Sequence, residues 1–391
     1  MNTALLQPKV QAYLEQHKNT DIHSFILKGS PFTTITVQEL AQQLEGKRKT
    51  RGKLPLWHTT KNILFPHKLN LEQTSSQITA QYKASLLEGK TVADGTGGFG
   101  IDAYHFAQKA TKVIHIEMNE ELSTLAKVNA KTLNQENITF ITGDSLQYFT
   151  ETSNHFDTIF LDPGRRTDVK GKVFMLKDCL PNVPLHKDML LSKCDNLWIK
   201  TAPILDITAG LRELENVAQI HIVAVKNEVK ELLWNLKPKK IDTPQITVVN
   251  LETKDPVVTF NYEDIFDIIP TYGKPSTYLY EPNAALMKSG AFNWISTHFK
   301  IEKLHEHSHL YTSKTLKAFP GRRFNITQQL PYSKKTLKTL GILKANITTR
   351  NFPLKVEEIR KKHKIKDGGD CYLFFTTLED GALTVLMCNK I

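Results

Sequence analysis

The segment VADGTGGFG (residues 92–100) says most about the fold of this chain. It begins as a short apolar strand and leads into an amphipathic stretch that is typical of a helix. Its glycines allow a sharp turn and let a ligand approach main-chain amides at the start of a helix, where an anion is favoured. Gly95, Gly97 and Gly100 also match the G-x-G-x-x-G pattern of dinucleotide-binding loops, so the loop alone leaves its ligand open.

Short apolar strands alternate with amphipathic helices around this loop, which is typical of a parallel α/β sheet. The expected strands are residues 91–94, 112–117, 138–144, 156–162, 196–200 and 219–226, with helices expected at 100–109, 119–134 and 207–215. The sequence therefore predicts a doubly wound, Rossmann-like α/β sheet. After residue 240 this alternation of strands and helices ends, and QITVVNLE and PVVTFNYE are predicted to form antiparallel strands.

Acidic residues end four consecutive strands of this sheet: Asp94, Glu117, Asp144 and Asp162. Because ligands bind outside the carboxyl ends of the strands in such sheets, we expect these four side chains to converge. A carboxylate at Asp94 would attract an ammonium group and repel a pyrophosphate, and Asp144 could accept a hydrogen bond from an adenine amine. These features favour S-adenosylmethionine as the ligand, although Asp94 and Asp144 could instead cap the helices that follow them.

Four stretches resemble the motif series of class I S-adenosylmethionine-dependent methyltransferases: DGTGGFG, IHIEMN, the GD that ends the third strand and the DP that ends the fourth. The resemblance implies that the glycine loop holds the methionine part of the cofactor, Glu117 the ribose hydroxyls, and the third strand end the adenine edge. The implied cofactor-binding residues are Asp94, Gly95, Thr96, Gly97, Glu117, Met118, Asp144 and Ser145.

Other stretches resemble a bacterial family of methyltransferases with a THUMP-like C-terminal domain. They are NLEQTSSQITAQYKA, DPGRR, YLYEPNAALMKSGAF and NFPLKVEEIRKKHKIKDGGDCYLFFTT. The resemblance covers most of the chain and implies RNA binding. The expected domains are a helical N-terminal domain (1–74), a class I methyltransferase domain (75–240), a small ferredoxin-like α+β domain (241–318) and a THUMP-like domain (319–391).

The catalytic residues are expected in DPGRR, at Asp162, Pro163, Arg165 and Arg166. In amino-methyltransferases the corresponding motif is usually Asp/Asn-Pro-Pro followed by an aromatic residue that stacks on the flipped base. Here the acceptors that orient an amine are kept, but Gly164 and Arg165 replace the second proline and the aromatic residue. We expect Asp162 and the Pro163 carbonyl to orient a target nitrogen, while the two arginines grip a phosphate or a base edge.

Positive charge is unevenly distributed along the chain. The 391 residues include 51 Lys and Arg against 40 Asp and Glu, a net charge of +11. Residues 1–75 carry +5 and residues 76–240 carry no net charge, whereas residues 313–366 contain fifteen basic and two acidic side chains. A basic block beside a neutral α/β core is a candidate surface for phosphates, so we predict that RNA (tRNA or rRNA) binds through residues 313–366.

The remaining composition excludes several classes of protein. Four cysteines without a C-x-x-C pair argue against a disulfide scaffold or a thiolate zinc site, and Cys179 and Cys194 are misplaced for a catalytic thiolate at a strand end. Residues 305–309 (HEHSH) would place three imidazoles on one face of a strand, but no carboxylate completes a site, so no metal is predicted. The chain lacks an apolar run of membrane-spanning length and a signal-like start, so we expect a cytoplasmic protein with no obligate protein partner.

The function that these features favour is methylation of a nitrogen of a base in structured RNA, with S-adenosylmethionine as the methyl donor. Two alternatives stay open from the sequence. One is a non-catalytic RNA-binding protein that keeps the methyltransferase fold, which the departure at DPGRR would allow. The other is a nicotinamide-dependent oxidoreductase that uses the same glycine loop.

Overall fold

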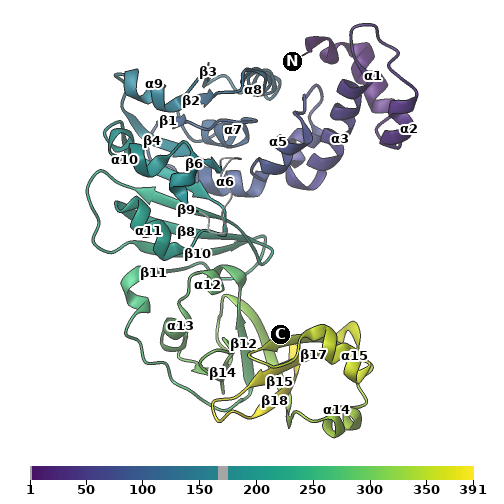
Figure 1. Cartoon of the computed structure of the whole chain (residues 1–391), viewed down its shortest axis with the longest axis vertical. Coiled ribbons are helices and arrows are strands. Elements are labelled where there is room, and N and C mark those ends of the chain that lie inside the picture. The colour runs from purple at the N-terminus through teal and green to yellow at the C-terminus, as the bar shows by residue number, and fades with distance from the viewer. Residues whose placement is uncertain (1, 166–174) are drawn as a thin grey trace. The chain divides into compact units, whose positions relative to one another are not determined.

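The structure is a computed structural model that describes residues 2–165 and 175–391, without the side chains of Arg165 and Thr339 (Figure 1). The chain divides into two compact units. The first comprises residues 1–218 and 233–241, and the second comprises residues 219–232 and 242–391. No helix of the described residues is both long enough and apolar enough to cross a membrane.

Helices fill the N-terminal part of the first unit, as predicted. Their bounds are η1 Thr3–Leu6, α1 Pro8–Gln16, α2 Ile22–Leu27, α3 Val37–Lys53, α4 Pro55–Thr59, α5 Lys68–Gln73 and α6 Gln77–Ser85 (Figure 1). A capping box starts α3, because Thr36 Oγ1 accepts a hydrogen bond from the Glu39 N–H and the Glu39 carboxylate accepts one from the Thr36 N–H. Phe99 and Ile101 join the apolar core of these helices, so the helices pack directly against the glycine loop.

A nine-stranded sheet, counted over the described residues, has the order β11-β10-β8-β9-β7-β4-β1-β2-β3. The predicted strands are present as β1 Thr91–Asp94, β2 Lys112–Glu117, β3 Ile138–Thr142, β4 Phe156–Leu161, β7 Cys194–Thr201 and β8 Val217–Val225. The helices beside them are α7 Ile101–Ala107, α8 Glu120–Thr132, α9 Ser145–Glu151, α10 Val183–Leu191 and α11 Ile207–Leu214. Neighbouring strands from β3 to β7 pair in parallel, which confirms the predicted Rossmann-like α/β fold.

The order of the strands changes direction at β1. The chain runs from β1 outward to β2 and β3, then returns to β4 on the other side of β1. Open α/β sheets bind their ligands at such a switch point, outside the carboxyl ends of the strands. The glycine loop leaves β1 there, and the DPGRR segment leaves β4. The third and fourth residues of DPGRR form the short strand β5 (Gly164–Arg165), which pairs with β6 (Cys179–Leu180).

Three further strands complete the sheet, one between β8 and β7 and two at the edge beyond β8. The strand β9 (Glu228–Leu236) was not predicted; it follows β8 after a turn in which Lys226 and Asn227 both have positive φ. The strands β10 (Gln245–Leu251) and β11 (Val258–Asn261) pair in antiparallel fashion, as predicted. They lie after residue 240 of the chain and still belong to the nine-stranded sheet.

The second unit contains a seven-stranded sheet with the order β13-β14-β12-β15-β18-β17-β16 among the described residues (Figure 1). Its strands are β12 Tyr278–Pro282, β13 Glu302–Lys303, β14 Tyr311–Ser313, β15 Gly321–Pro331, β16 Lys344–Arg350, β17 Lys366–Thr377 and β18 Leu383–Lys390. Its helices are η3 Tyr262–Ile265, α12 Ala284–Lys288, α13 Phe292–Phe299, α14 Lys334–Leu340 and α15 Val356–His363. The predicted strand over residues 305–309 is wrong, because these residues form the turn between β13 and β14.

Candidate active site

A cavity of about 200 Å³ lies at the carboxyl ends of β1, β2 and β4. Thr96 and the residues after it line it from the glycine loop, Glu117 from the end of β2 and Asp162 from the end of β4. The opposite wall comes from the segment between α5 and α6, including Thr74 and Ser75. Of the four acids predicted to converge, Glu117 and Asp162 are among the described residues that line this cavity, whereas Asp94 and Asp144 are not.

The glycine loop is held tightly against the sheet. Asp94 is only 1% exposed, and its Oδ1 accepts a hydrogen bond from the Thr96 N–H at 3.1 Å. A Cβ at Gly97 would lie 2.3 Å from His115 Nε2, so only glycine fits there. The cap of α7 is Gly100, at φ +81°, where an L side chain would be strained. The helix-cap alternative for Asp94 is therefore wrong.

Glu117 fixes the far side of the loop. Its Oε2 accepts a hydrogen bond from the Gly98 N–H at 2.7 Å, and its Oε1 accepts one from the Asn119 N–H at 2.8 Å. A carboxylate oxygen has a second lone pair, so Glu117 can still accept hydrogen bonds from a ligand in the cavity. Met118 stands next to it with 70% of its surface exposed.

Asp144 has the local role that the sequence left open. Its Oδ1 accepts hydrogen bonds from the Leu146 N–H at 2.7 Å and from the Gln147 N–H at 3.3 Å, so it caps α9. Ser145 is buried beneath the glycine loop, where its Cβ would lie 3.3 Å from a Cβ at Gly95. Neither Asp144 nor Ser145 is among the described residues that line the cavity.

Asp162 is tied to both of its neighbouring strands. Its N–H donates to Thr96 Oγ1 at 2.6 Å, which couples DPGRR to the glycine loop. Its Oδ2 forms an ion pair with Lys200 Nζ at 2.7 Å. Lys200 lies near the carboxyl end of β7 and was not predicted as a site residue, although a lysine at the end of a predicted strand is a signal for one. The predicted Arg166 and the Arg165 side chain lie outside what the structure describes.

A buried lysine supports the wall opposite the glycine loop. Lys83, in α6, is 3% exposed and pairs with Asp102 Oδ1 at 2.7 Å. It also donates to Ser75 Oγ at 2.6 Å, and the Ser75 hydroxyl donates to Asp102 Oδ2 at 2.7 Å. Both Ser75 and Asp102 line the cavity. Lys83 and Asp102 were not predicted, because nothing local in the sequence marks their pairing.

Replacing Lys83 with methionine is expected to destabilise the protein by about 3–5 kcal/mol, because it leaves the Asp102 carboxylate without its cation. Denaturant unfolding measures the loss, and Lys109→Met, at an exposed lysine after α7, is the matched control with little expected effect. Adding Asp102→Asn to Lys83→Met should recover part of the stability. A Lys83→Met variant as stable as the wild type would contradict the assigned ion pair.

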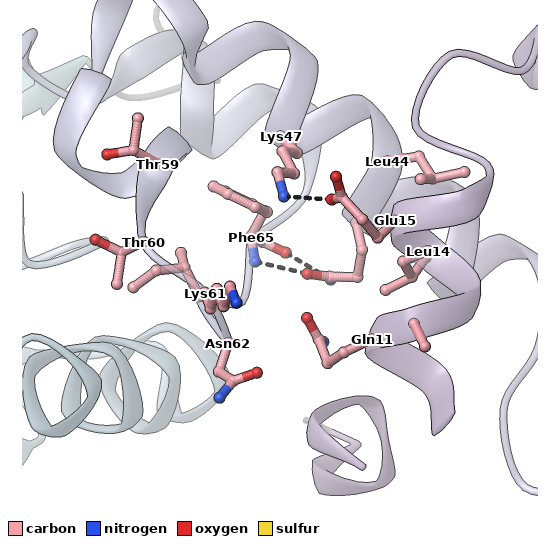
Figure 2. A pocket seen from close by; sticks show the side chains of 13 residues that line it. Gln11, Leu14, Glu15, Leu44, Lys47, Thr59, Thr60, Lys61, Asn62 and Phe65 are labelled. Carbon is pink, nitrogen blue, oxygen red and sulfur yellow. Dashed lines mark hydrogen bonds and ion pairs between the residues drawn. The ribbon is translucent and has the colours of Figure 1, made fainter. Parts of the chain in front are cut away.

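A larger cavity of about 510 Å³ lies among α1, α3 and the loop of residues 59–65 (Figure 2). Its main polar groups already have partners. Glu15 Oε2 pairs with Lys47 Nζ at 3.0 Å, as Figure 2 shows. The Gln43 side-chain amide accepts a hydrogen bond from the Phe65 N–H and donates one to the Phe65 carbonyl. It also lies away from the strand ends that carry the motifs. We therefore assign the cofactor to the smaller cavity.

Comparisons with known proteins find similar families and similar proteins. Three family models match: "Conserved hypothetical protein 95" over residues 70–177, a ferredoxin-like domain over 278–320 and a THUMP domain-like model over 321–390. An uncharacterised RNA methyltransferase of Clostridium acetobutylicum is 39% identical over 160 residues, covering 37% of this chain and 35% of that protein. Another, of Mycoplasma mobile, is 27% identical over 137 residues, covering 33% and 37%. The chain thus spans about a third of the length of these curated relatives.

A solved structure matches from end to end. It is the crystal structure of a "putative methyltransferase from Porphyromonas gingivalis W83", with 32% sequence identity and a TM-score of 0.91. The match covers 100% of this chain and 99% of the other. Because it spans both chains, and because the THUMP domain-like model matches the C-terminal part, the chain belongs to the family of that P. gingivalis protein, a methyltransferase family with a THUMP-like C-terminal domain, which confirms the resemblance seen in the sequence.

Proposed function

We propose that this protein is an S-adenosylmethionine-dependent methyltransferase that modifies a nitrogen of a base in structured RNA. The observation that carries the proposal is the cavity at the switch point of the sheet, bounded by the glycine loop, Glu117 and Asp162. The family supports the class of reaction. The names of the Clostridium and Mycoplasma relatives support RNA as the substrate.

The residues of the cavity fit S-adenosylmethionine. Glu117 has free lone pairs for ribose hydroxyls. Asp94 and the loop at Thr96 and Gly97 would hold the methionine part, although the amides of these two loop residues already donate to Asp94 and to the Ile116 carbonyl. Because the cavity is smaller than the roughly 300–1,000 Å³ of most ligand sites, the adenine would lie along the open edge by the exposed Met118 and Asp144, with the buried Ser145 behind them. When bound, the cofactor would supply an electrophilic methyl group on a sulfonium.

The acceptor side of the site is built by DPGRR. Lys200 occupies Asp162 Oδ2, so Oδ1 and the Pro163 carbonyl are the acceptors that would orient a target amine. Orientation and exclusion of water supply most of the catalysis in such a displacement. Arg165 and Arg166 would bind a phosphate or a base edge next to it.

The cysteines support nitrogen over carbon as the acceptor. Methylation of a pyrimidine carbon needs a thiolate nucleophile near the methyl donor. Cys194 begins β7, at the strand end away from the cavity, and burial raises the pKa of its thiol to about 12. Cys179 is buried in β6.

Cofactor affinity is expected to depend on pH through Asp94. Burial, with the nearby charge of Asp102, raises the pKa of Asp94 well above its ordinary value of 3.8, and Lys83 only partly opposes this. The ammonium of the methionine part favours the ionised carboxylate, so binding below the raised pKa must release a proton. Affinity for S-adenosylhomocysteine should therefore fall, by up to about tenfold per pH unit, as the pH drops below that pKa.

Calorimetry in buffers of different ionisation enthalpy measures this proton release. Asp94→Asn should abolish the pH dependence, even if the variant binds less tightly. Affinity that is independent of pH in the wild type, with no proton released, would contradict the role of Asp94.

The basic face of α14 and α15 supports RNA as the partner. We use this name for the exposed lysines Lys334, Lys335, Lys338, Lys361, Lys362 and Lys364. The two helices contact each other, and the charges of Lys362 and Lys334 add to burial in lowering the pKa of His363. Tyr332 lies among these lysines, with Lys362 Nζ 3.1 Å from its hydroxyl. Lysines around an aromatic ring suit a nucleic-acid backbone and its bases.

Two measurements test the proposed function. S-adenosylhomocysteine should raise the unfolding temperature whereas NAD should not, because only a ligand of the native state stabilises it. Nucleoside mass spectrometry of tRNA and rRNA from cells lacking the protein should then show one methylated nucleoside missing. Cofactor binding with no change in any RNA would favour a non-catalytic RNA-binding protein.

A further inference from the structure

Two arginines in the second unit share one buried carboxylate. Glu281, in β12, has a side chain that is only 4% exposed. Its Oε1 accepts from Arg350 Nη2 at 2.9 Å, and its Oε2 accepts from Arg322 Nε at 2.6 Å. Arg322 comes from β15 and Arg350 from the end of β16, so three strands meet at this group.

This arrangement carries more positive charge than its own structure needs. One carboxylate neutralises one guanidinium, so the group of Glu281, Arg322 and Arg350 keeps a net charge of +1. The two arginine side chains are 37% and 34% exposed. Within the described part of the chain, the Nη1 group of neither arginine has a hydrogen-bond acceptor. Both guanidiniums therefore have donors left for a ligand.

The guanidiniums are also held in place. Arg322 lies over the ring of Phe324, with 5.5 Å from its Cζ to the ring centroid, and its Nη2 donates to Thr348 Oγ1 at 3.3 Å. Arg350 is held through Nε and Nη2 on the same Glu281 oxygen. A fixed planar fork binds a phosphate in a defined geometry, which an exposed lysine does not.

We propose that Arg322 and Arg350 form a binding site for one phosphate of the RNA backbone, with Glu281 as the residue that positions both guanidiniums. The proposal rests on the proposed function, since it takes RNA as the partner. Glu281 itself would repel a phosphate little, because it is buried and both of its oxygens are paired.

The site is linked to the basic face of α14 and α15 by direct contacts. Phe352, two residues after Arg350, packs edge-on against Tyr332 with 5.0 Å between ring centroids, and Lys362 bonds the Tyr332 hydroxyl. The lysines of the basic face would attract RNA from any direction. The arginine pair would then set which phosphate lies there, and so the register of the RNA.

Arg350→Lys is the variant that separates a fixed fork from a simple charge. It keeps the charge and can still pair with Glu281, but it loses the planar donors. In binding assays with bulk bacterial tRNA at several KCl concentrations, we expect affinity to fall about tenfold with an unchanged salt slope. Arg350→Gln should weaken binding further and reduce the slope by about 0.7–0.9. Arg212→Gln, at an exposed arginine of α11, should bind like the wild type.

Each other outcome overturns the inference. If Arg350→Lys binds tRNA with wild-type affinity, Arg350 acts only as a positive charge. If Arg212→Gln loses as much tRNA affinity as Arg350→Gln, the effect is not specific to the site. If inorganic phosphate raises the unfolding temperature of the wild type alone while the arginine variants keep wild-type tRNA affinity, the site takes free phosphate. If changing the lysines of the basic face to glutamate abolishes tRNA binding while the Arg350 variants bind like the wild type, the phosphate site at Arg322 and Arg350 is refuted but the proposed function is kept. A wild-type protein that binds no tRNA refutes both.

Discussion

Replacing Asp162 with alanine is expected to lower methyl transfer by about 100-fold or more while cofactor affinity stays within a few fold. The reason is geometric. The Asp162 side chain carries the acceptor proposed to orient the target nitrogen, whereas its contact with the glycine loop is made by the main-chain N–H, which alanine keeps. Transfer of a labelled methyl group to total RNA measures the first effect, and calorimetry with S-adenosylhomocysteine measures the second.

The control for this variant is Asp195→Ala. Asp195 is an exposed aspartate at the amino end of β7, away from Lys200, and it pairs with His155. Its loss should therefore leave methyl transfer unchanged. Asp162→Asn keeps one acceptor oxygen and should retain more activity than Asp162→Ala. Equal rates for the wild type and Asp162→Ala would remove Asp162 from the mechanism.

The strands that the sequence revealed are those with a strong local signal. The strands β1, β2 and β4 are short apolar runs that end in an acid or a glycine turn, and a buried parallel strand needs that pattern. The missed strand β9 (EVKELLWNL) is rich in residues that favour helices. Its turn, Lys226-Asn227, adopts positive φ at both positions without a glycine to mark it.

The candidate site likewise contains residues that a local sequence pattern predicts and residues whose roles depend on distant parts of the chain. Asp94, Glu117 and Asp162 could be predicted, because the end of a strand is a local property and parallel strands bring their ends together. Lys200 and Lys83 could not, because their roles depend on partners that only the fold brings within 2.7 Å. Asp144 was ambiguous for a physical reason, since a strand end that starts a helix serves equally as a cap.

The net charge of +11 is separated from the chemistry. The predicted methyltransferase domain is neutral, and the surplus lies in the N-terminal helices and in residues 313–366. In the structure eight of the fifteen basic residues of this segment form two features: the exposed lysines of the basic face, and the arginine pair held by Glu281. The lysines are suited to attracting RNA, and the arginine pair to fixing which phosphate it binds. Loss of the lysines should therefore change the salt dependence of RNA binding far more than loss of the arginine pair.

Reversing Lys334, Lys335, Lys361 and Lys362 to glutamate is expected to weaken RNA binding about 100-fold or more at low salt and to flatten its salt dependence. Each lysine that neutralises a phosphate contributes about 0.7–0.9 to the slope of log affinity against log salt, so losing most of these contacts should lower the slope by about 2–3. Binding of bulk tRNA over a KCl series measures both quantities, and the affinity for S-adenosylhomocysteine should stay unchanged.

A matched reversal separates a specific surface from net charge. Lys109, Lys112, Lys127 and Lys131 are exposed lysines of the methyltransferase sheet and its helices, and two of them flank the amino end of β2, away from the cavity. Reversing these four changes the net charge by the same amount, yet it should leave the salt slope near that of the wild type. If both reversals weakened RNA binding equally, long-range attraction by the total charge would explain the affinity, and residues 313–366 would lose their assigned role.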